Sequence, residues 1–262
     1  MYSVNGVPLD NPSLGWILRA PTKPLSTLSY ERASLASGGR DGVVAGLPAT
    51  TGPVSLRFVV QSARANLETL IAVFGAGGTL ALTASSGRQV EFETLSHTPE
   101  GFGPADAVVD ATFLIRLPGA FWRDITQSTK TSPLAAASVA VSVFGGISAP
   151  VADAVIRVQG AATAIQVTDS SGAWVVLPNV AAGQWARFDS ASGKAFVTTS
   201  DTWSGGTDVS GQVDFGGPRG VFEITPALTP GNPTLRFGQL TVTTASRNGA
   251  SVDVRGKAAY VL

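Results

Sequence analysis

The residues best suited to catalysis are two glutamates and a histidine in the N-terminal half of the chain. Glu91 and Glu93 are two positions apart on an expected β-strand, so both carboxylates face the same side, and His97 follows nearby. A pair of carboxylates can perform acid–base work on a glycosidic bond. No second cluster of titratable residues supports a cleft around this pair. We therefore expect an ordinary solvated strand face here and no catalytic residue.

Four aspartates in glycine-containing loops offer hard oxygen ligands of the kind that calcium prefers: Asp169, Asp189, Asp201 and Asp208. They lack the fixed spacing of a calcium-binding loop, and aspartate is a common turn residue. Cysteine is absent, and neither a GxSxG nor an HExxH motif occurs. The sequence therefore predicts no metal and no cofactor, and it disfavours thiolate, zinc and serine-nucleophile chemistry.

A tryptophan in a long glycine-rich segment, residues 198–220, is the strongest candidate for a binding residue. Trp203 is followed closely by Gly205 and Gly206. An aromatic ring on a flexible loop can anchor another protein or stack on a sugar, and the sequence does not choose between the two. We expect the segment to be an inserted docking loop. Trp174 and Phe188, which alternate with polar neighbours, are instead expected in the core.

The charge content indicates a subunit of an assembly. Only 14% of the 262 residues are charged, against roughly a quarter in typical soluble domains. The 18 basic residues balance the 18 acidic ones, so little self-repulsion keeps copies apart. No basic run is present that could displace counterions from phosphates, which disfavours nucleic-acid binding.

Two segments resemble membrane or targeting sequences only superficially. Residues 133–152 carry no charge, but glycines, a proline and several serines interrupt them, so we expect an interdomain crossing after a strand at 139–144 and no membrane span. The first residues lack the basic region and apolar block of a signal peptide, so export by a cleaved signal is not expected.

The N-terminal half predicts one helix on a mainly antiparallel sheet. A strand at 56–60 is followed by an apolar stripe with helical spacing, made of Leu67, Leu70, Ile71 and Phe74. Ser62 is expected to cap the start of this helix, and Gly75 its end. Further strands are expected at 80–82, 90–92 and 107–115, and residues 118–123 close the module.

The C-terminal half alternates with a period of two, which predicts short strands in a sandwich of antiparallel sheets. Expected inward-facing residues on these strands are Ala154, Ile156, Val158, Ile165, Val167, Trp174, Val176, Ala186 and Phe188. Residues 169–172 supply a turn, and a proline–glycine turn lies within 228–233. The fold class is therefore mainly β: an antiparallel sheet or split barrel with one packed helix, followed by a sandwich.

An ordered series of motifs resembles the distal tail proteins of long-tailed, siphovirus-type bacteriophages. In the N-terminal half the series comprises residues 39–42, the strand 55–60, the single helix, two hairpins and residues 117–122. In the C-terminal half it comprises 145–146, 149–150, 156–160, 188–189 and 228–232, which are similar to the galectin-like second domain of that family. The resemblance implies a ring-forming domain at 1–134 and a galectin-like β-sandwich at 135–262.

The resemblance also implies a structural virion protein with no enzymatic activity. Such proteins form a ring, usually hexameric, at the distal end of the tail, joining the tail tube to the tip or baseplate and leaving a channel for DNA. The expected partners are further copies, the tail tube protein and a tail-tip hub protein, with receptor-binding proteins as a further class. Assembly is expected in the host cytoplasm. For the subunit interface we expect Arg40, Asp41 and Trp122, although a local salt bridge and a core tryptophan are alternative interpretations.

Two other functions stay open. One is a carbohydrate-binding or receptor-binding tail component, and the other is a glycan-cleaving enzyme that uses Glu91 or Glu93. Sugar-binding galectins present a histidine on the sheet of the sandwich, whereas His97 lies in the N-terminal half. Carbohydrate binding therefore cannot be inherited from the fold alone.

Overall fold

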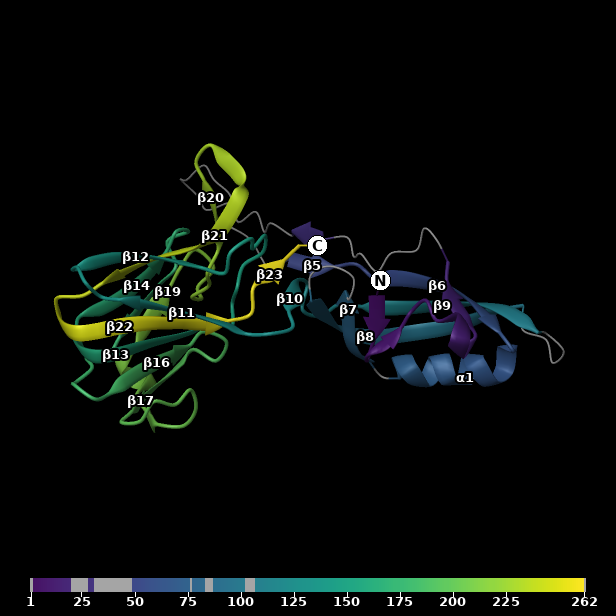
Figure 1. Cartoon of the computed structure of the whole chain (residues 1–262), viewed down its shortest axis with the longest axis horizontal. Helices are drawn as coiled ribbons and strands as arrows, with labels where there is room; N and C mark the ends of the chain where they lie inside the picture. Colours follow the sequence, from purple (N-terminus) through teal and green to yellow (C-terminus); the bar gives the residue numbers. More distant parts are fainter. Residues whose placement is uncertain are drawn as a thin grey trace, which may run out of the picture. The chain divides into compact units, whose positions relative to one another are not determined.

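The computed structural model describes residues 2–19, 28–30, 49–75, 77–82, 87–101 and 107–261 (Figure 1). The chain divides into two compact units, Met1–Ile125 with Val261–Leu262, and Thr126–Tyr260. Antiparallel β-sheet dominates both units, and α1 is the only α-helix in the described part. The predicted mainly β fold, with one helix on a sheet followed by a β-sandwich, is confirmed.

The first unit is built on one antiparallel sheet with the strand order β2-β1-β7-β8-β9-β6-β3, and β10 pairs with β8. A separate two-stranded sheet joins β4 and β5. The elements are β1 (Tyr2–Val4), β2 (Val7–Pro8), the 3-10 helix η1 (Pro12–Leu14), β3 (Trp16–Leu18), β4 (Leu28–Tyr30), β5 (Ala49–Thr51), β6 (Val54–Gln61), α1 (Ala63–Phe74), β7 (Gly77–Leu82), β8 (Arg88–Glu100), β9 (Val108–Arg116) and β10 (Trp122–Asp124).

Helix α1 packs its apolar stripe on one face of this sheet. Leu67, Leu70 and Phe74 are buried as predicted, while Ile71 is partly exposed. The ring of Phe74 stacks on that of Phe113 with centroids 4.4 Å apart, and Phe58 meets both rings edge-on. These aromatic contacts join the helix to the central strands β6 and β9.

The two ends of α1 differ from each other in how they are capped. Gly75 caps the C-terminus through its backbone N–H, which donates to the carbonyl of Ile71 at 2.9 Å. Ser62 precedes the helix but its side chain makes no capping hydrogen bond, because its backbone is left-handed with φ 50° instead of extended. The predicted serine cap is therefore wrong.

The second unit is a sandwich of two antiparallel sheets. One sheet has the order β11-β22-β13-β16-β17-β18, and the other has the order β12-β21-β14-β15-β19, with β20 attached to β21. The strands are β11 (Ser128–Pro133), β12 (Ser138–Val143), β13 (Val155–Thr163), β14 (Ile165–Asp169), β15 (Trp174–Leu177), β16 (Trp185–Asp189), β17 (Lys194–Thr198), β18 (Thr207–Asp208), β19 (Asp214–Gly216), β20 (Pro226–Thr229), β21 (Asn232–Thr243) and β22 (Ser246–Gly256), with the 3-10 helix η2 (Ser210–Gln212) between β18 and β19. The short strand β23 (Ala259–Tyr260) follows β22 and belongs to neither of these two sheets.

Most of the predicted inward residues of the sandwich are buried, but on β15 the opposite set of alternate residues faces inward. Val175 and Leu177 point inward, whereas Trp174 and Val176 are partly exposed. Val175 pairs with the buried Val167 across β14, and this pairing fixes the face. Trp174 instead pairs with Gly216 on β19, where its ring covers the backbone. The expectation that Trp174 is a core residue is therefore wrong.

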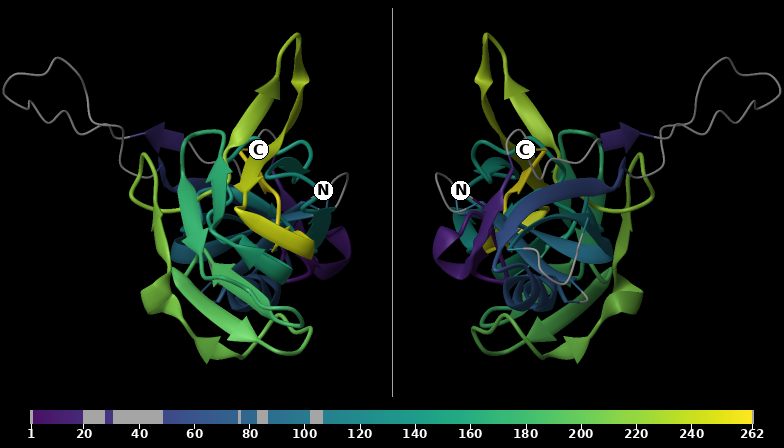
Figure 2. Two further views of the ribbon diagram at one scale, coloured as in Figure 1. Left: turned by 90° about the vertical axis from the view of Figure 1, so that its left-hand side faces the viewer. Right: turned by 90° about the vertical axis from the view of Figure 1, so that its right-hand side faces the viewer.

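The division between the units falls before β11. Residues Ser128–Pro133 pair with Ser251–Gly256 of β22, so they belong to the sandwich, although the sequence placed the boundary at 134/135. The uncharged stretch 133–152 contains β12, and no helix of the described residues is long and apolar enough to span a membrane. The predicted proline–glycine turn joins β20 to β21 in a hairpin that extends away from the two sheets (Figure 1; Figure 2).

Candidate functional site

The carboxylates and the histidine that suggested acid–base chemistry lie on opposite faces of the sheet. Glu93 is the register partner of Arg116 and forms an ion pair with it, on the face away from α1. A bulge follows between Thr94 and Ser96, so His97 pairs with Phe113 and stacks on its ring at 6.0 Å, on the helix side. The bulge inverts the alternation of the strand, so Glu93 and His97 cannot act on one substrate.

The four loop aspartates accept hydrogen bonds from their own surroundings. Asp169 is buried and accepts from the backbone of Ser171 at 2.8 Å and from the hydroxyl of Thr225 at 2.6 Å. Asp189 accepts from the N–H of Ala191, and Asp208 from Ser210. Asp201 pairs with an arginine, as described below. These contacts are those of turn residues, and no group of three or more metal-ligating side chains occurs among the described residues.

Trp203 lies against the sheet instead of standing free on a loop. The guanidinium carbon of Arg157 is 4.1 Å from the centre of its ring, and that of Arg255 is 5.0 Å away. Asp201, two residues earlier, accepts a hydrogen bond of 2.5 Å from Nη1 of Arg157. The carbonyl oxygen of Gly205 accepts one of 3.1 Å from Arg187. Residues 201–205 are thus fixed to the outer face of the sheet that contains β13, β16 and β22.

Arg157 is the centre of a polar row that crosses this sheet. Asp253 on β22 and Arg187 on β16 are its direct cross-strand partners. Asp253 also accepts a 2.6 Å hydrogen bond from Thr131 on β11, the next strand. The side chains of Arg157 and Asp253 are each only 6% exposed. The ion pair satisfies both buried charges, so its role is structural.

Arg187 is less completely satisfied than Arg157. Its Nη1 is buried without a hydrogen-bond partner, and its guanidinium lies 4.8 Å from the ring centre of Phe196. Burial lowers the pKa of Arg187, Asp189 opposes this effect and Arg157 adds to it. An arginine stays charged nonetheless, so residues 201–205, which lie over Arg187, cover a cation.

The segment 198–220 belongs to the sandwich. Val197 pairs with Thr207 of β18, and Val175 pairs with Phe215 of β19, so the segment supplies an edge strand to each sheet. Gly206 leaves no room for a side chain, because a Cβ there would lie 2.8 Å from the carbonyl of Val197. The expectation of an inserted loop is therefore wrong in its structural part; a docking role of Trp203, Gly205 and Gly206 stays a prediction.

The expected subunit-interface residues are only partly visible. Arg40 and Asp41 lie outside the described residues. Trp122 is 4% exposed, and its ring centre is 6.2 Å from that of Tyr2. A side chain this buried adds little surface to a contact with another copy, so any effect of Trp122 on assembly would act through the position of β1.

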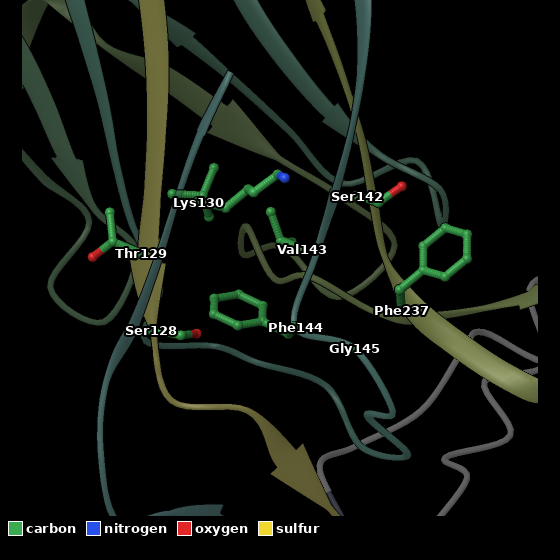
Figure 3. A pocket seen from close by; sticks show the side chains of 9 residues that line it. Ser128, Thr129, Lys130, Ser142, Val143, Phe144, Gly145 and Phe237 are labelled. Atoms are coloured by element: carbon green, nitrogen blue, oxygen red, sulfur yellow. The ribbon is translucent and has the colours of Figure 1, made fainter.

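A groove of about 450 Å³ lies at the open side of the sandwich, where β11 ends one sheet and β12 ends the other (Figure 3). Its lining is formed by Ser128, Thr129, Lys130, Ser142, Val143, Phe144, Gly145, Phe237 and Val254. Phe144 has a left-handed backbone with φ 51°, which is unusual for a bulky residue, and its ring lies against Gly256. The groove is thus built from both sheets and is mainly apolar.

A buried acidic pair lies close to the base of the β20–β21 hairpin. Burial raises the pKa of Glu223; Arg219, which donates hydrogen bonds of 3.1 and 3.3 Å to it, opposes this effect, and Asp169 adds to it. Asp169 holds Thr225, the residue before β20, through two hydrogen bonds. Asp169 therefore positions the start of the hairpin, and Glu223 is held by Arg219 beside it.

Sequence reasoning did not identify the Arg157–Asp253 pair or the groove. Opposite charges on two apolar strands of a chain poor in charge were a usable signal for the pair, but only the pairing of β13 with β22 brings them together. The groove depends on which strands end the two sheets, and periodicity does not contain that information.

Comparison with known proteins relates the chain to a phage protein by fold. No protein-family model matches the sequence, and no curated protein matches it either. Among solved structures, the crystal structure of the SPP1 Dit protein matches over 98% of this chain and 98% of its own, with a TM-score of 0.57 and 11% identity. The two folds are similar. Dit is described there as a paradigm of the hub adsorption apparatus in phages that infect Gram-positive bacteria.

A second match concerns a larger assembly. The phage P2 baseplate in its activated conformation with calcium matches over 93% of this chain and 91% of the matched chain, at 10% identity and a TM-score of 0.34. Similarity of this size carries no argument about fold. The likeness to Dit, by contrast, extends over both units.

Proposed function

We propose that this protein is a structural subunit of the distal end of a bacteriophage tail. The observation that carries the proposal is the likeness to SPP1 Dit over 98% of both chains, together with the ordered motifs of the sequence. The match covers the residues of both units, so the likeness does not rest on one common sandwich.

The proposed assembly is a hexameric ring that joins the tail tube to the tip or baseplate and leaves a channel for DNA. The first unit forms the ring, and the second unit, a galectin-like sandwich, lies at its periphery and contacts the tail-tip hub or receptor-binding proteins. The low and balanced charge of the chain supports close contact between copies. A closed ring requires two different patches on each subunit, which meet around the rotation axis.

The proposed role requires no catalysis. Glu93 and His97, the residues that suggested acid–base chemistry, lie on opposite faces of the sheet. Each loop aspartate is engaged in a turn or an ion pair. The alternative of a carbohydrate-binding tail component gains no support from Trp203, because Arg157 stacks on its ring.

Electron microscopy of phage particles tests the proposal. An antibody against the protein, or a tag added to it, should label the distal end of the tail, and averaged images should show a closed six-fold ring there. Purified protein at high concentration should give rings in negative stain. Labelling of the capsid, or a single copy or a trimer at the tail tip, would contradict the proposal.

A further inference from the structure

Strand β12 forms one edge of its sheet in the part of the chain that the structure describes. It is the first strand in the order β12-β21-β14-β15-β19, so no described strand lies on its outer side. Its residues, Ser138–Val143, include neither a charge nor a proline. Exposed edge strands normally carry such residues because they prevent pairing with other chains. The facing edge strand β11 has both, in Lys130 and Pro133.

The groove described above runs beside this edge. Val143, Phe144 and Val254 form its apolar floor but are themselves buried. Phe237 on β21 is partly exposed and offers the accessible apolar surface beside the end of β12 (Figure 3). Two strands bound it, so an occupant with the length of a strand fits it better than a compact molecule does. Six residues of added strand would extend about 20 Å and would direct alternate side chains into the groove.

Lys130 supplies the charge of the groove. Its side chain extends from β11 toward the β12 side (Figure 3), and its ammonium has no ion-pair partner among the described residues. An unpaired cation at the mouth of an apolar groove favours an occupant that brings a carboxylate.

We propose that the edge of β12 and the adjoining groove bind an extended segment of a different protein, apolar at alternate positions and carrying one acidic side chain. The segment adds to the sheet as a further strand beside β12. Its main chain pairs with the edge of β12. Its apolar side chains contact Phe237 on the outer face of the sheet, and its carboxylate, on the inner side, meets Lys130. This inference rests on the proposed function only for the expectation that the protein has neighbours in an assembly.

Peptide binding to the full-length protein tests the inference. The probes are two fluorescent, acetylated and amidated ten-residue peptides of alternating valine and threonine, one with a central glutamate and one with a central lysine. The glutamate peptide should bind about threefold to tenfold more tightly, as expected for reversal of one exposed charge pair. Lys130→Glu should reverse the preference. The matched control, Lys194→Glu, alters an exposed lysine of β17 in the same sheet and should leave the preference unchanged.

Hydrogen exchange locates the bound peptide. The glutamate peptide should slow exchange of backbone amides in Ser138–Val143 and leave the exchange of β18 and β19, at the opposite edges, unchanged. Equal affinity for the two peptides in the wild type, or protection away from β12, would overturn the inference. It would also be overturned if light scattering showed that copies pair with one another through β12. Imaging of particles tests the proposed function separately.

Discussion

Arg157 and Asp253 face each other directly across β13 and β22, and their side chains form an ion pair of 2.7 Å on the outer face of the sheet. Both are buried because residues 201–205 cover them, with Asp201 bound to the same arginine and Trp203 stacked on it. The pair thus links the flat face of a sheet to a segment that sequence alone assigned to a loop.

Removal of Asp253 should destabilise the protein strongly. Asp253→Ala leaves Arg157 as a buried cation that has lost its main partner, which typically costs about 3–5 kcal/mol. Asp201→Ala is the matched control, because that carboxylate is 67% exposed and an exposed pair contributes about 0–1 kcal/mol. Urea unfolding of both variants measures the difference. Equal effects would show that the pair does not behave as a buried one.

A charge introduced beneath α1 should destabilise the protein severely. Leu70 is fully buried on the sheet, so Leu70→Asp combines the loss of a large core side chain with an unpaired buried charge and should cost several kcal/mol. Arg64→Ala, on the exposed side of α1, should change stability by less than about 0.5 kcal/mol. Denaturant midpoints compare the two, and an unchanged midpoint for the aspartate variant would mean that the stripe is not packed.

Trp203 should contribute to the stability of the isolated protein. Trp203→Ala removes a ring stacked by Arg157 and uncovers the Arg157–Asp253 pair, so a loss of about 1–2 kcal/mol is expected from the cation–π contact alone. Thermal unfolding of the purified protein measures it. If stability is unchanged while assembly of particles falls, Trp203 is a docking residue and not a structural one.

Glu223 should make the protein less stable as pH rises. Its pKa in the folded state is raised, chiefly by burial, so the folded protein binds more protons at this group than the unfolded chain does. Stability therefore falls as pH increases from the ordinary glutamate pKa, about 4.3, through the raised value. Glu223→Gln should remove this part of the slope. Unfolding free energies at several pH values between 4 and 8 provide the measurement, and an unchanged slope in the variant would contradict the assignment.

A methyl group at Gly238 should disrupt the sandwich. A Cβ there would overlap with Ile224 and lie 3.0 Å from Val143, so Gly238→Ala should cost about 1–3 kcal/mol through overpacking. Gly145→Ala is the control, because nothing lies within 4 Å of a Cβ at that position. Both are read by denaturant melts. A neutral Gly238→Ala would show that the side chains of Ile224 and Val143 move aside easily at this point.

Local periodicity was sufficient to predict the classes of element. The helical spacing of Leu67, Leu70 and Phe74 identified α1 and its buried face, and alternation identified most strands of both units. These predictions succeeded because the apolar pattern of an element depends only on its own geometry, with a period of 3.6 residues in a helix and two in a strand.

The positions of the candidate site residues depended on pairing between distant strands. One bulge moved His97 away from Glu93, the partner strand β14 turned Trp174 outward, and two edge strands drew residues 198–220 into the sandwich. The free edge of β12 and the Arg157–Asp253 pair likewise exist only once the order of the strands is set. A sequence specifies which face of a strand is apolar, but register and strand order are decided by contacts between residues far apart in the chain, so only the tertiary structure determines what those residues meet.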